Sequence, residues 1–319
     1  MDKRNPDKNQ TTQLIKAKAR GLGFTACGIA RAEPVSAAEQ KKVSQWLGRS
    51  YNGKMQFMAN HFEKRMDPTL LVPGARSIIC LALNYHQKNF QPLGSHYRVS
   101  QYAAGKDYHL IIKEKLHLLL EYIKEQTNVE VARVFTDSAP VLERYWAQKA
   151  GLGWTGKNAC LIIPQKGSYF FLAEILLDVD LEYDNPFEKD YCGSCTRCLD
   201  YCPTGAITSP GVIDAQRCIS YLTIELKDEV PEALQDKTEQ YVFGCDICQE
   251  VCPHNIKFAS PTKEKDLEAL PALFTWEKED WEQMEKSAFR KNFIKKFSPL
   301  SRAGYKKLAN TIQMVQKLK

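Results

Sequence analysis

The chain has 319 residues, of which 44% are hydrophobic, 26% charged and 10% aromatic. This composition excludes a disordered or fibrous protein, and the length fits two domains with an additional terminal segment. No apolar run approaches the roughly 18 residues that cross a bilayer, and the polar N-terminus lacks the apolar stretch of a secretory signal. We therefore expect a soluble, cytoplasmic protein without a membrane partner.

The formal net charge of +6 is concentrated in the C-terminal part of the chain. Residues 286–319 contain ten Lys or Arg and no Asp or Glu, so the remainder of the chain is slightly acidic. A uniformly basic tail is typical of a segment that contacts a polyanion. A solvated helical surface explains the same pattern, and the charge alone does not distinguish the two.

Hydrophobic periodicity predicts an irregular succession of helices and strands in the first 185 residues. The expected helices cover residues 12–22, 35–49, 107–126 and 140–150. The expected strands cover residues 24–30, 77–85, 129–135, 159–164 and 168–177. Because strands and helices do not alternate regularly, we expect an α+β layer domain over residues 1–185. A cysteine-rich module over residues 186–260 and a basic helical segment over residues 261–319 are expected to follow.

Gly151, Gly153 and Gly156 have the G-x-G-x-x-G spacing of a dinucleotide-binding loop. Such a loop follows a strand and opens a helix, whose N-terminus holds the pyrophosphate. Here a predicted helix precedes the glycines and a predicted strand follows them. We therefore interpret the motif as a tight turn where backbone lies close to a ligand or to another segment.

Eight of the eleven cysteines lie between residues 192 and 252, which points to metal binding in a reducing compartment. The first four form C-x2-C-x2-C-x3-C-P, in which three thiolates hold one [4Fe–4S] cluster and the fourth binds another. Zinc is the alternative, but it does not explain why both cysteine groups end in Cys-Pro. The other three cysteines, Cys27, Cys80 and Cys160, have apolar neighbours and are expected in the core. The predicted ligands are Cys192, Cys195, Cys198 and Cys252 for one cluster, and Cys202, Cys218, Cys245 and Cys248 for the other.

Asp137 follows a predicted strand and faces the start of a predicted helix, a position where ligand sites are common. A carboxyl group that is desolvated there can stay protonated and donate its proton. The alternative is that Asp137, or the neighbouring Ser138, only caps the following helix. The pattern alone leaves both interpretations open.

The chain carries, in this order, the motifs VFTDSAPVLER, GLGWTGKN, GSYFFLAEILLD, CGSCTRCLDYCPTGAI, CISYLTIE and FGCDICQEVCP. Together they resemble the epoxyqueuosine reductase family, from about residue 21 to residue 255. The resemblance implies a nitroreductase-like cobalamin-binding domain, a bacterial two-[4Fe–4S] ferredoxin-like module and a short helical C-terminal tail. It also implies an oxidoreductase that converts epoxyqueuosine to queuosine at the wobble position of tRNA, using base-off cobalamin and two [4Fe–4S] clusters.

The same resemblance implies roles for individual residues, with Asp137 as the proton donor. For Arg65 a surface ion pair with a nearby Glu is the alternative. The usual cobalamin-binding signature D-x-H-x-x-G begins at Asp107 and His109, but Ile112 occupies its glycine position and the helix pattern suggests ordinary packing. This departure agrees with the resembled family, whose cobalamin has no protein imidazole on cobalt. The residues expected to contact cobalamin are Arg65, Asp137, Asn158, Ser168, Ser220 and Asp246.

The implied reaction needs two electrons and two protons, so we expect electrons to pass from the clusters to cobalamin while Asp137 donates a proton. An external low-potential electron donor and a monomeric chain are expected. The implied substrate assigns the basic tail to the phosphates of a tRNA anticodon arm. The candidate phosphate partners are Lys286, Arg290, Lys291, Lys295, Lys296, Arg302, Lys306 and Lys307. The periodic aromatics Phe289, Phe293, Phe297 and Tyr305 are expected to be core residues.

Three other functions fit part of the sequence. A reductive dehalogenase pairs the same cofactors with a related domain, but it is commonly exported with a twin-arginine signal, which we do not find. A two-cluster electron carrier would bind no cobalamin, and a zinc-dependent nucleic-acid-binding module would bind no iron. Some members of the resembled family carry a further helical-repeat domain, which we do not expect in a chain ending at Lys319.

Overall fold

The computed structural model describes residues 7–88, 90 and 96–318. Its N-terminal half is built on a four-stranded antiparallel sheet with the strand order β1-β2-β7-β4. The two central strands are almost continuously buried, as their apolar sequences predict. The strands are β1 (Ala26–Arg31), β2 (Ser77–Asn84), β7 (Phe170–Leu177) and β4 (Ala132–Phe135).

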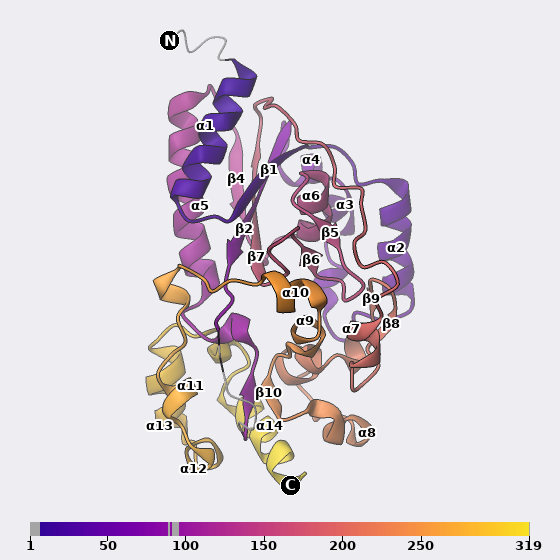
Figure 1. Ribbon diagram of the computed structural model, residues 1–319, viewed down its shortest axis with the longest axis vertical. Helices are drawn as coiled ribbons and strands as arrows, with labels where there is room; N and C mark the ends of the chain where they lie inside the picture. Colours follow the sequence, from indigo (N-terminus) through magenta and orange to yellow (C-terminus); the bar gives the residue numbers. More distant parts are fainter. Residues whose placement is uncertain (1–6, 89, 91–95, 319) are drawn as a thin grey trace.

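Helices cover both faces of this sheet (Figure 1). On one face lie α1 (Lys8–Gly21) and α5 (Tyr108–Gln126), and on the other lie α2 (Ala37–Gly48), α3 (Phe62–Met66), α4 (Pro68–Leu71) and α6 (Glu143–Lys149). Along β2, Ile79 and Leu81 pack toward α5, whereas Ile78 and Cys80 pack toward α6. The two-residue period of the strand therefore decides which core each side chain enters. The expected α+β class is confirmed.

Gly151 and Gly153 lie in the turn between α6 and β5 (Trp154–Thr155), and Gly156 follows β5 in the hairpin that it forms with β6 (Leu161–Ile162). Gly151 has φ +76°, a left-handed conformation that side chains rarely adopt. A Cβ atom on Gly153 would lie 2.0 Å from the carbonyl oxygen of Ile162. The interpretation as a tight turn against another segment is thus confirmed.

The cysteine-rich segment consists of single helical turns and one hairpin. Helices α7 and α9 carry Cys198 and Cys248 and pack against each other. The first cysteine group (Cys192, Cys195, Cys198 and Cys202) and the second cysteine group (Cys218, Cys245, Cys248 and Cys252) therefore lie side by side. Helix α10 begins with the proline that follows Cys252. The elements are α7 (Arg197–Asp200), β8 (Ile207–Ser209), β9 (Val212–Ile213), α8 (Glu232–Gln235), β10 (Tyr241–Phe243), α9 (Ile247–Glu250) and α10 (Pro253–Phe258).

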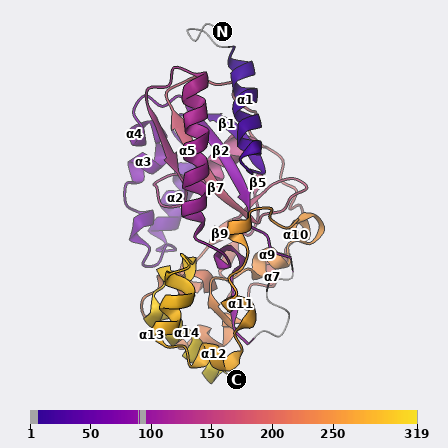
Figure 2. The same ribbon diagram turned by 90° about the vertical axis from the view of Figure 1, so that its left-hand side faces the viewer.

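The C-terminal helices form a separate body below the sheet, at the end of the long axis opposite the N-terminus (Figure 2). Their core also contains Tyr97 and Val99, because β3 (Arg98–Val99) pairs in parallel with β10. The sequence did not predict this contribution from the N-terminal half. The helices are α11 (Ala272–Thr275), α12 (Lys278–Glu282), α13 (Lys286–Phe289) and α14 (Tyr305–Lys317), with the short 3-10 helix η8 (Pro299–Arg302) before the last.

The aromatic side chains of the C-terminal segment divide between core and surface. Phe289 and Phe293 are buried and Tyr305 packs against the same core, as expected. Phe297 is 60% exposed, so its predicted place in the core is wrong. It sits at the turn between two helices with φ +53°, which breaks the helical period.

The C-terminal body is attached to the N-terminal half next to the start of α5. The amide of Asp107 donates to the carbonyl of Phe297 at 2.6 Å, and Lys106 pairs with Asp266 at 3.3 Å. The predicted domain boundaries at residues 185 and 260 stay predictions, and Lys319 lies outside the described residues. None of the helices within the described ranges is long and apolar enough to cross a membrane.

Candidate functional site

Asp137 lies in the turn that follows β4, with a left-handed φ of +58°. Its amide donates a hydrogen bond to Glu143 Oε1 at 2.6 Å. Helix α6 starts at Glu143, and neither Asp137 nor Ser138 caps it, because the preceding residue is Leu142 and no side chain accepts there. The capping alternative for Asp137 is therefore wrong.

The Asp137 carboxylate is contacted by three side chains from two distant segments. Oδ2 accepts a hydrogen bond from the Tyr108 hydroxyl at 3.0 Å and lies 3.1 Å from His109 Nε2. Arg302, in η8, places a guanidinium nitrogen 3.5 Å from the same oxygen. The side chains of Asp137 and Arg302 are 49% and 46% exposed, so this cluster opens to solvent.

His109 connects Asp137 to a second carboxylate. The Asp107 side chain caps α5 by accepting the amide of His109, and its Oδ1 also lies 2.7 Å from His109 Nδ1. Burial lowers the pKa of His109, but the hydrogen bonds with Asp107 and Asp137 outweigh burial and raise it. The imidazole between two carboxylates therefore tends to carry a proton.

The same contacts act on Asp137 in the opposite direction. Burial raises the pKa of Asp137, but the hydrogen bond and charge of His109, then Tyr108 and Arg302, bring it below its ordinary value. The sequence led us to expect a carboxyl group held protonated by desolvation. In this arrangement the lowered pKa favours the carboxylate form of Asp137 instead, and the raised pKa of His109 favours the protonated imidazole beside it.

Two further charged residues stand behind this cluster. Burial raises the pKa of Glu143 to about 7. Arg65 is buried in α3 and donates to the carbonyl of Phe57 at 2.9 Å, while its Nε has no hydrogen-bond partner. It makes none of the ion pairs found among the described residues, so the surface ion pair considered for Arg65 is wrong. A buried donor without a partner suits a ligand oxygen.

The other residues expected at a cobalamin pocket lie at the junction with the second cysteine group. The Asn158 amide donates to the carbonyl of Cys248 at 3.3 Å, and the Ser168 hydroxyl accepts from Asn255 at 2.9 Å. Asp246 accepts from the Ser100 hydroxyl at 2.5 Å and from the Gln101 amide at 2.7 Å. The Ser220 hydroxyl hydrogen-bonds to Cys218. These four side chains thus already have protein partners, in contrast to Arg65.

Tyr108 and His109 are the residues that sequence reasoning missed. They form the first turn of an amphipathic helix, where they were interpreted as ordinary packing. Asp-Tyr-His at the start of this helix was the available signal, because a capping Asp orients a His two residues later. Arg302 was expected to contact phosphate, and only the fold brings it to Asp137.

The cysteine sulfurs receive hydrogen bonds of the kind that cluster-bound thiolates need. The indole of Trp154 donates to Cys192 Sγ at 3.4 Å, and the amide of Ala206 donates to Cys202 Sγ at 3.3 Å. The expected core position of Cys160 is only partly met, because this residue is only partly buried, and its thiol hydrogen-bonds to Cys248. The indole and backbone donors to Cys192 and Cys202, within a group of eight cysteines, fit iron–sulfur clusters.

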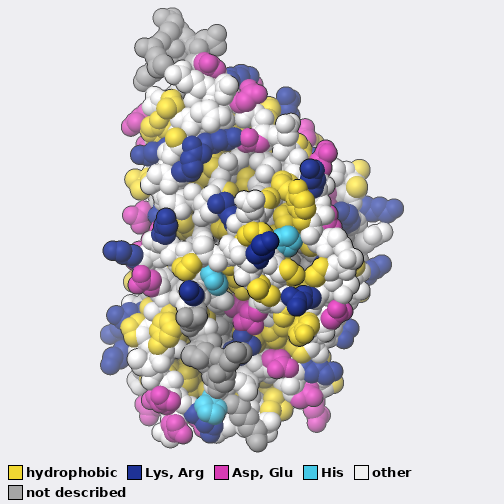
Figure 3. Space-filling view, viewed as in Figure 1, with side chains coloured by type: hydrophobic (Ala, Val, Ile, Leu, Met, Phe, Trp, Pro, Cys, Tyr) yellow, Lys and Arg dark blue, Asp and Glu magenta, His cyan; other side chains and the backbone are white. Residues whose placement is uncertain are grey.

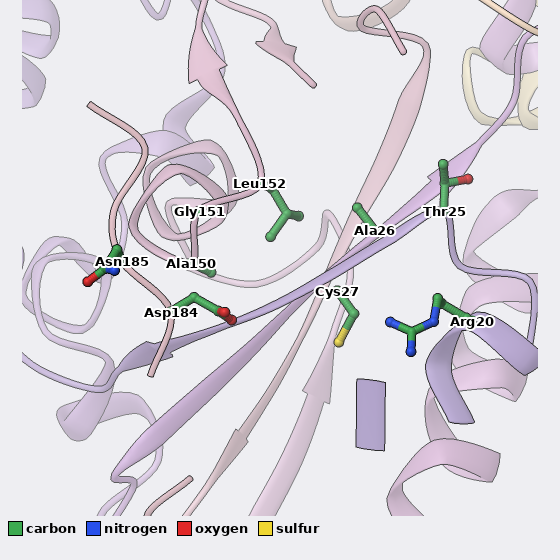
Figure 4. Close-up of a pocket in the computed structure, with 9 residues that line it drawn as sticks. All are labelled: Arg20, Thr25, Ala26, Cys27, Ala150, Gly151, Leu152, Asp184 and Asn185. Atoms are coloured by element: carbon green, nitrogen blue, oxygen red, sulfur yellow. The ribbon is translucent and has the colours of Figure 1, made fainter. Parts of the chain in front are cut away.

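A pocket of about 360 Å³ opens beside the start of β1, between α1 and the turn after α6 (Figure 4). Arg20, Cys27 and Asp184 are among its lining residues. It contains none of the residues predicted for the site. The expected core position of Cys27 is only partly met, because this residue is partly exposed at the pocket.

Two family models match the chain. The model described as "Epoxyqueuosine reductase QueG, DUF1730" matches residues 65–138, which include Arg65, His109 and Asp137. The model described as "4Fe-4S double cluster binding domain" matches residues 191–255, which include all eight clustered cysteines. This second match supports two [4Fe–4S] clusters and removes the zinc alternative.

Curated proteins named epoxyqueuosine reductase are similar over almost the whole chain. The protein from Cyclobacterium marinum is 49% identical over 306 residues, which is 96% of each chain. The protein from Cellulophaga algicola is 46% identical over 97% of this chain and 99% of its own. The Escherichia coli K12 protein is 40% identical over 89% of this chain and 78% of its own.

Solved structures of the same kind superpose closely. A crystal structure of epoxyqueuosine reductase with an epoxyqueuosine-modified tRNA-Tyr stem loop has a TM-score of 0.87 at 30% identity, over 96% of this chain and 80% of that chain. The Bacillus subtilis enzyme, with its catalytic aspartate loop swung out of the active site, has a TM-score of 0.84 at 31% identity, over 96% and 81%. A catabolic reductive dehalogenase has a TM-score of 0.51 at 16% identity, which shows a common fold only.

Proposed function

The chain belongs to the epoxyqueuosine reductase family, and from this membership we propose that it reduces epoxyqueuosine to queuosine at the wobble position of tRNA. It is an oxidoreductase of queuosine biosynthesis. The observation that carries the proposal is the set of proton-bearing side chains around Asp137, in a chain that also holds two [4Fe–4S] clusters. Proton donors and an electron path are the two requirements of the reaction.

The proton path that we propose runs through residues of α5. Conversion of an epoxide to an alkene and water consumes two electrons and two protons, and the oxygen leaves readily only when it is protonated. Asp137 is the proposed proton donor to that oxygen. His109 then supplies a proton to the Asp137 carboxylate across the 3.1 Å contact between Nε2 and Oδ2. The Tyr108 hydroxyl, 3.0 Å from Asp137, helps to orient the carboxylate.

Cobalamin is part of the proposal, and the unpartnered donor of Arg65 supports it. The buried Nε of Arg65 has no protein partner, so it is available to an oxygen of the corrin side chains. Asn158, Ser168, Ser220 and Asp246, beside the second cysteine group, are the other residues that we propose to contact the cofactor, together with Asp137. When bound, cobalamin supplies a low-valent centre that converts single electrons from the clusters into a two-electron reduction.

The two clusters are proposed to have crossed ligands. In this scheme, Cys252 joins Cys192, Cys195 and Cys198, and Cys202 joins Cys218, Cys245 and Cys248. The packing of α7 against α9 supports it, because interleaved ligands require the two cysteine groups to be adjacent. An external low-potential donor fills the clusters one electron at a time. We also propose that the chain acts as a monomer in the cytoplasm.

The tRNA is proposed to dock on the C-terminal segment next to Asp137. Of the eight basic residues proposed as phosphate partners, Lys307 is buried and donates to the carbonyl of Asp228 at 3.2 Å, so it is excluded from this role. The other seven are exposed. On the face shown in Figure 3, Lys and Arg side chains are spread out rather than gathered in one patch. Arg302 is the one of the seven that contacts the Asp137 carboxylate.

The direct test is anaerobic reconstitution of the chain with iron, sulfide and cobalamin, followed by incubation with a reductant and tRNA that carries epoxyqueuosine. Mass analysis of the nucleosides should show loss of one oxygen atom, with queuosine as the product. A chain that holds both clusters and cobalamin but leaves the epoxide unchanged would contradict the proposal.

A further inference from the structure

The loop that carries the glycine motif contacts both cysteine groups. It lies between α6 and β6, in the half of the chain that contains the sheet. A backbone hydrogen bond joins this loop to the cysteine-rich segment, because the amide of Gly211 donates to the carbonyl of Lys157 at 2.9 Å. The loop therefore joins the N-terminal half to the cysteine-rich segment at the clusters themselves.

Trp154 contacts the first cysteine group through its indole. Its Nε1 donates to Cys192 Sγ at 3.4 Å, and the side chain is only 2% exposed. The ring is fixed by a stacked contact with Phe187 and by edge contacts with Tyr191 and His254. These contacts hold the indole with its N–H directed at the sulfur.

Lys157 contacts the same cysteine group through its ammonium. Its Nζ donates to the carbonyl of Gly193 at 2.6 Å and to the carbonyl of Cys195 at 2.9 Å. A positive charge therefore lies against the backbone between Cys192 and Cys195, and no carboxylate of the described residues forms an ion pair with it.

The far end of the same loop contacts the second cysteine group. Asn158 donates to the carbonyl of Cys248 at 3.3 Å, and Cys160 hydrogen-bonds to the thiol of Cys248. The loop therefore contacts the two cysteine groups differently. The first cysteine group receives an indole N–H and a positive charge from it, and the second cysteine group receives neither.

Reduction adds one electron to a cluster and makes it more negative. Hydrogen bonds to the cluster sulfurs and nearby positive charge stabilise that reduced state, so they raise the reduction potential. We propose that Trp154 and Lys157 raise the reduction potential of the cluster bound through Cys192 and Cys195, so that this loop sets the potential difference between the two clusters. The proposal deepens the proposed function, because it concerns electron delivery, but it requires only that the clusters are bound.

The test is an EPR-monitored redox titration of the full chain, reconstituted anaerobically, in the absence of tRNA. Trp154→Phe keeps the ring and removes the N–H, and Lys157→Gln keeps a donor but removes the charge. Each should lower the midpoint potential of one cluster and leave that of the other unchanged. A tenfold change in the one-electron equilibrium constant corresponds to a shift of about 59 mV, which sets the scale of the expected effect.

The matched control is Trp46→Phe, because Trp46 also donates its indole N–H in this region, but to the carbonyl of Ile213 at 2.7 Å. It should leave both potentials unchanged. Unchanged potentials in both loop variants, or equal shifts in the Trp46 control, would overturn the proposal. If Trp154→Phe does not take up iron, the solvent-accessible Lys157→Gln decides the question alone. Because no substrate is used, failure of epoxide reduction would not affect this result.

Discussion

Asp137 is fixed by its backbone independently of its side chain. A left-handed φ at a residue other than glycine is unfavourable, and the Glu143 carboxylate compensates by accepting the amide at 2.6 Å. The side-chain contacts depend on charge, because His109 and Arg302 favour the carboxylate form. The backbone contact persists when Asp137 is neutral and able to donate.

Replacing Glu143 should therefore displace the loop of Asp137. We expect Glu143→Ala to reduce turnover about tenfold, which corresponds to loss of one hydrogen bond of about 1.4 kcal/mol. Glu143→Gln keeps an acceptor oxygen and should retain most of the turnover. Hydrogen exchange of the Asp137 amide gives a second readout, since it should be faster in the Ala variant only. Equal behaviour of the two variants would exclude this positioning role.

The His109 contact predicts how turnover depends on pH. Its pKa is raised and that of Asp137 is lowered, so a proton shared between the two groups resides on the imidazole. As the pH rises through the raised pKa of His109, the imidazole loses the proton that it would pass to Asp137, so kcat should fall. His109→Gln should remove this alkaline limb and reduce kcat by about 10²-fold. The exposed His117→Gln is the control and should keep the limb. A limb that persists without His109 would contradict the relay.

At the scale of elements, strand β7 has a buried carboxyl group in its centre. Glu174 is fully buried between Cys80 and Phe135, and neither carboxylate oxygen has a hydrogen-bond partner. Burial, and then the charge of Glu143, raises its pKa well above the ordinary value. Folding therefore favours the neutral form of the side chain, whereas the unfolded chain ionises it at neutral pH.

Replacing Glu174 by a residue that cannot ionise should raise the free energy of unfolding. A group whose pKa is raised on folding contributes stability that is complete below the unfolded pKa and is lost as pH rises toward the folded value. Glu174→Gln cannot ionise, so its free energy of unfolding should exceed that of the parent chain by about 1–3 kcal/mol at neutral pH. Thermal unfolding at pH 5 and pH 8 measures this, and the advantage should shrink at pH 5. A variant that is less stable at both pH values would refute this explanation.

The elements with strong periodic patterns were predictable, and those defined by distant pairing were not. The apolar runs of β2 and β7 and the amphipathic period of α5 identified these elements within a few residues. The pairing of β3 with β10 was not predictable, because two- and three-residue strands carry no periodic signal.

In the site, too, local patterns were predictable and contacts between distant segments were not. Cysteine spacing predicted the cluster ligands, which stay proposals, whereas Arg302 approaches Asp137 only through the fold.

At the scale of the whole molecule, the site lies where the C-terminal body meets the sheet domain. Asp107, His109 and Asp137 belong to the sheet domain, and Arg302 belongs to the C-terminal body. The Asp107 amide also donates to Phe297, so both bodies contact the same cluster. The exposed Phe297 and the exposed Arg302 of the C-terminal body therefore lie next to the site.

This arrangement predicts that tRNA binding depends steeply on salt. Each phosphate neutralised by a Lys or Arg releases condensed counterions, so affinity falls as salt rises. Changing both Lys295 and Lys296 to Glu should weaken tRNA binding at least tenfold and flatten the salt dependence. The buried Lys307→Gln should leave the salt dependence unchanged, provided that it folds. Binding of the parent chain that does not respond to salt would exclude this surface as the tRNA contact.

The account depends most on reduction of the epoxide by a chain in which Asp137 supplies the proton. The most direct measurement compares Asp137→Asn with the parent chain after identical anaerobic reconstitution, by iron and cobalamin content and by nucleoside mass. The parent chain should bind about eight iron atoms and convert epoxyqueuosine to queuosine. The variant should bind the same cofactors and convert the substrate at least 10²-fold more slowly. Equal conversion by both, or no conversion by a fully loaded parent chain, would contradict the account.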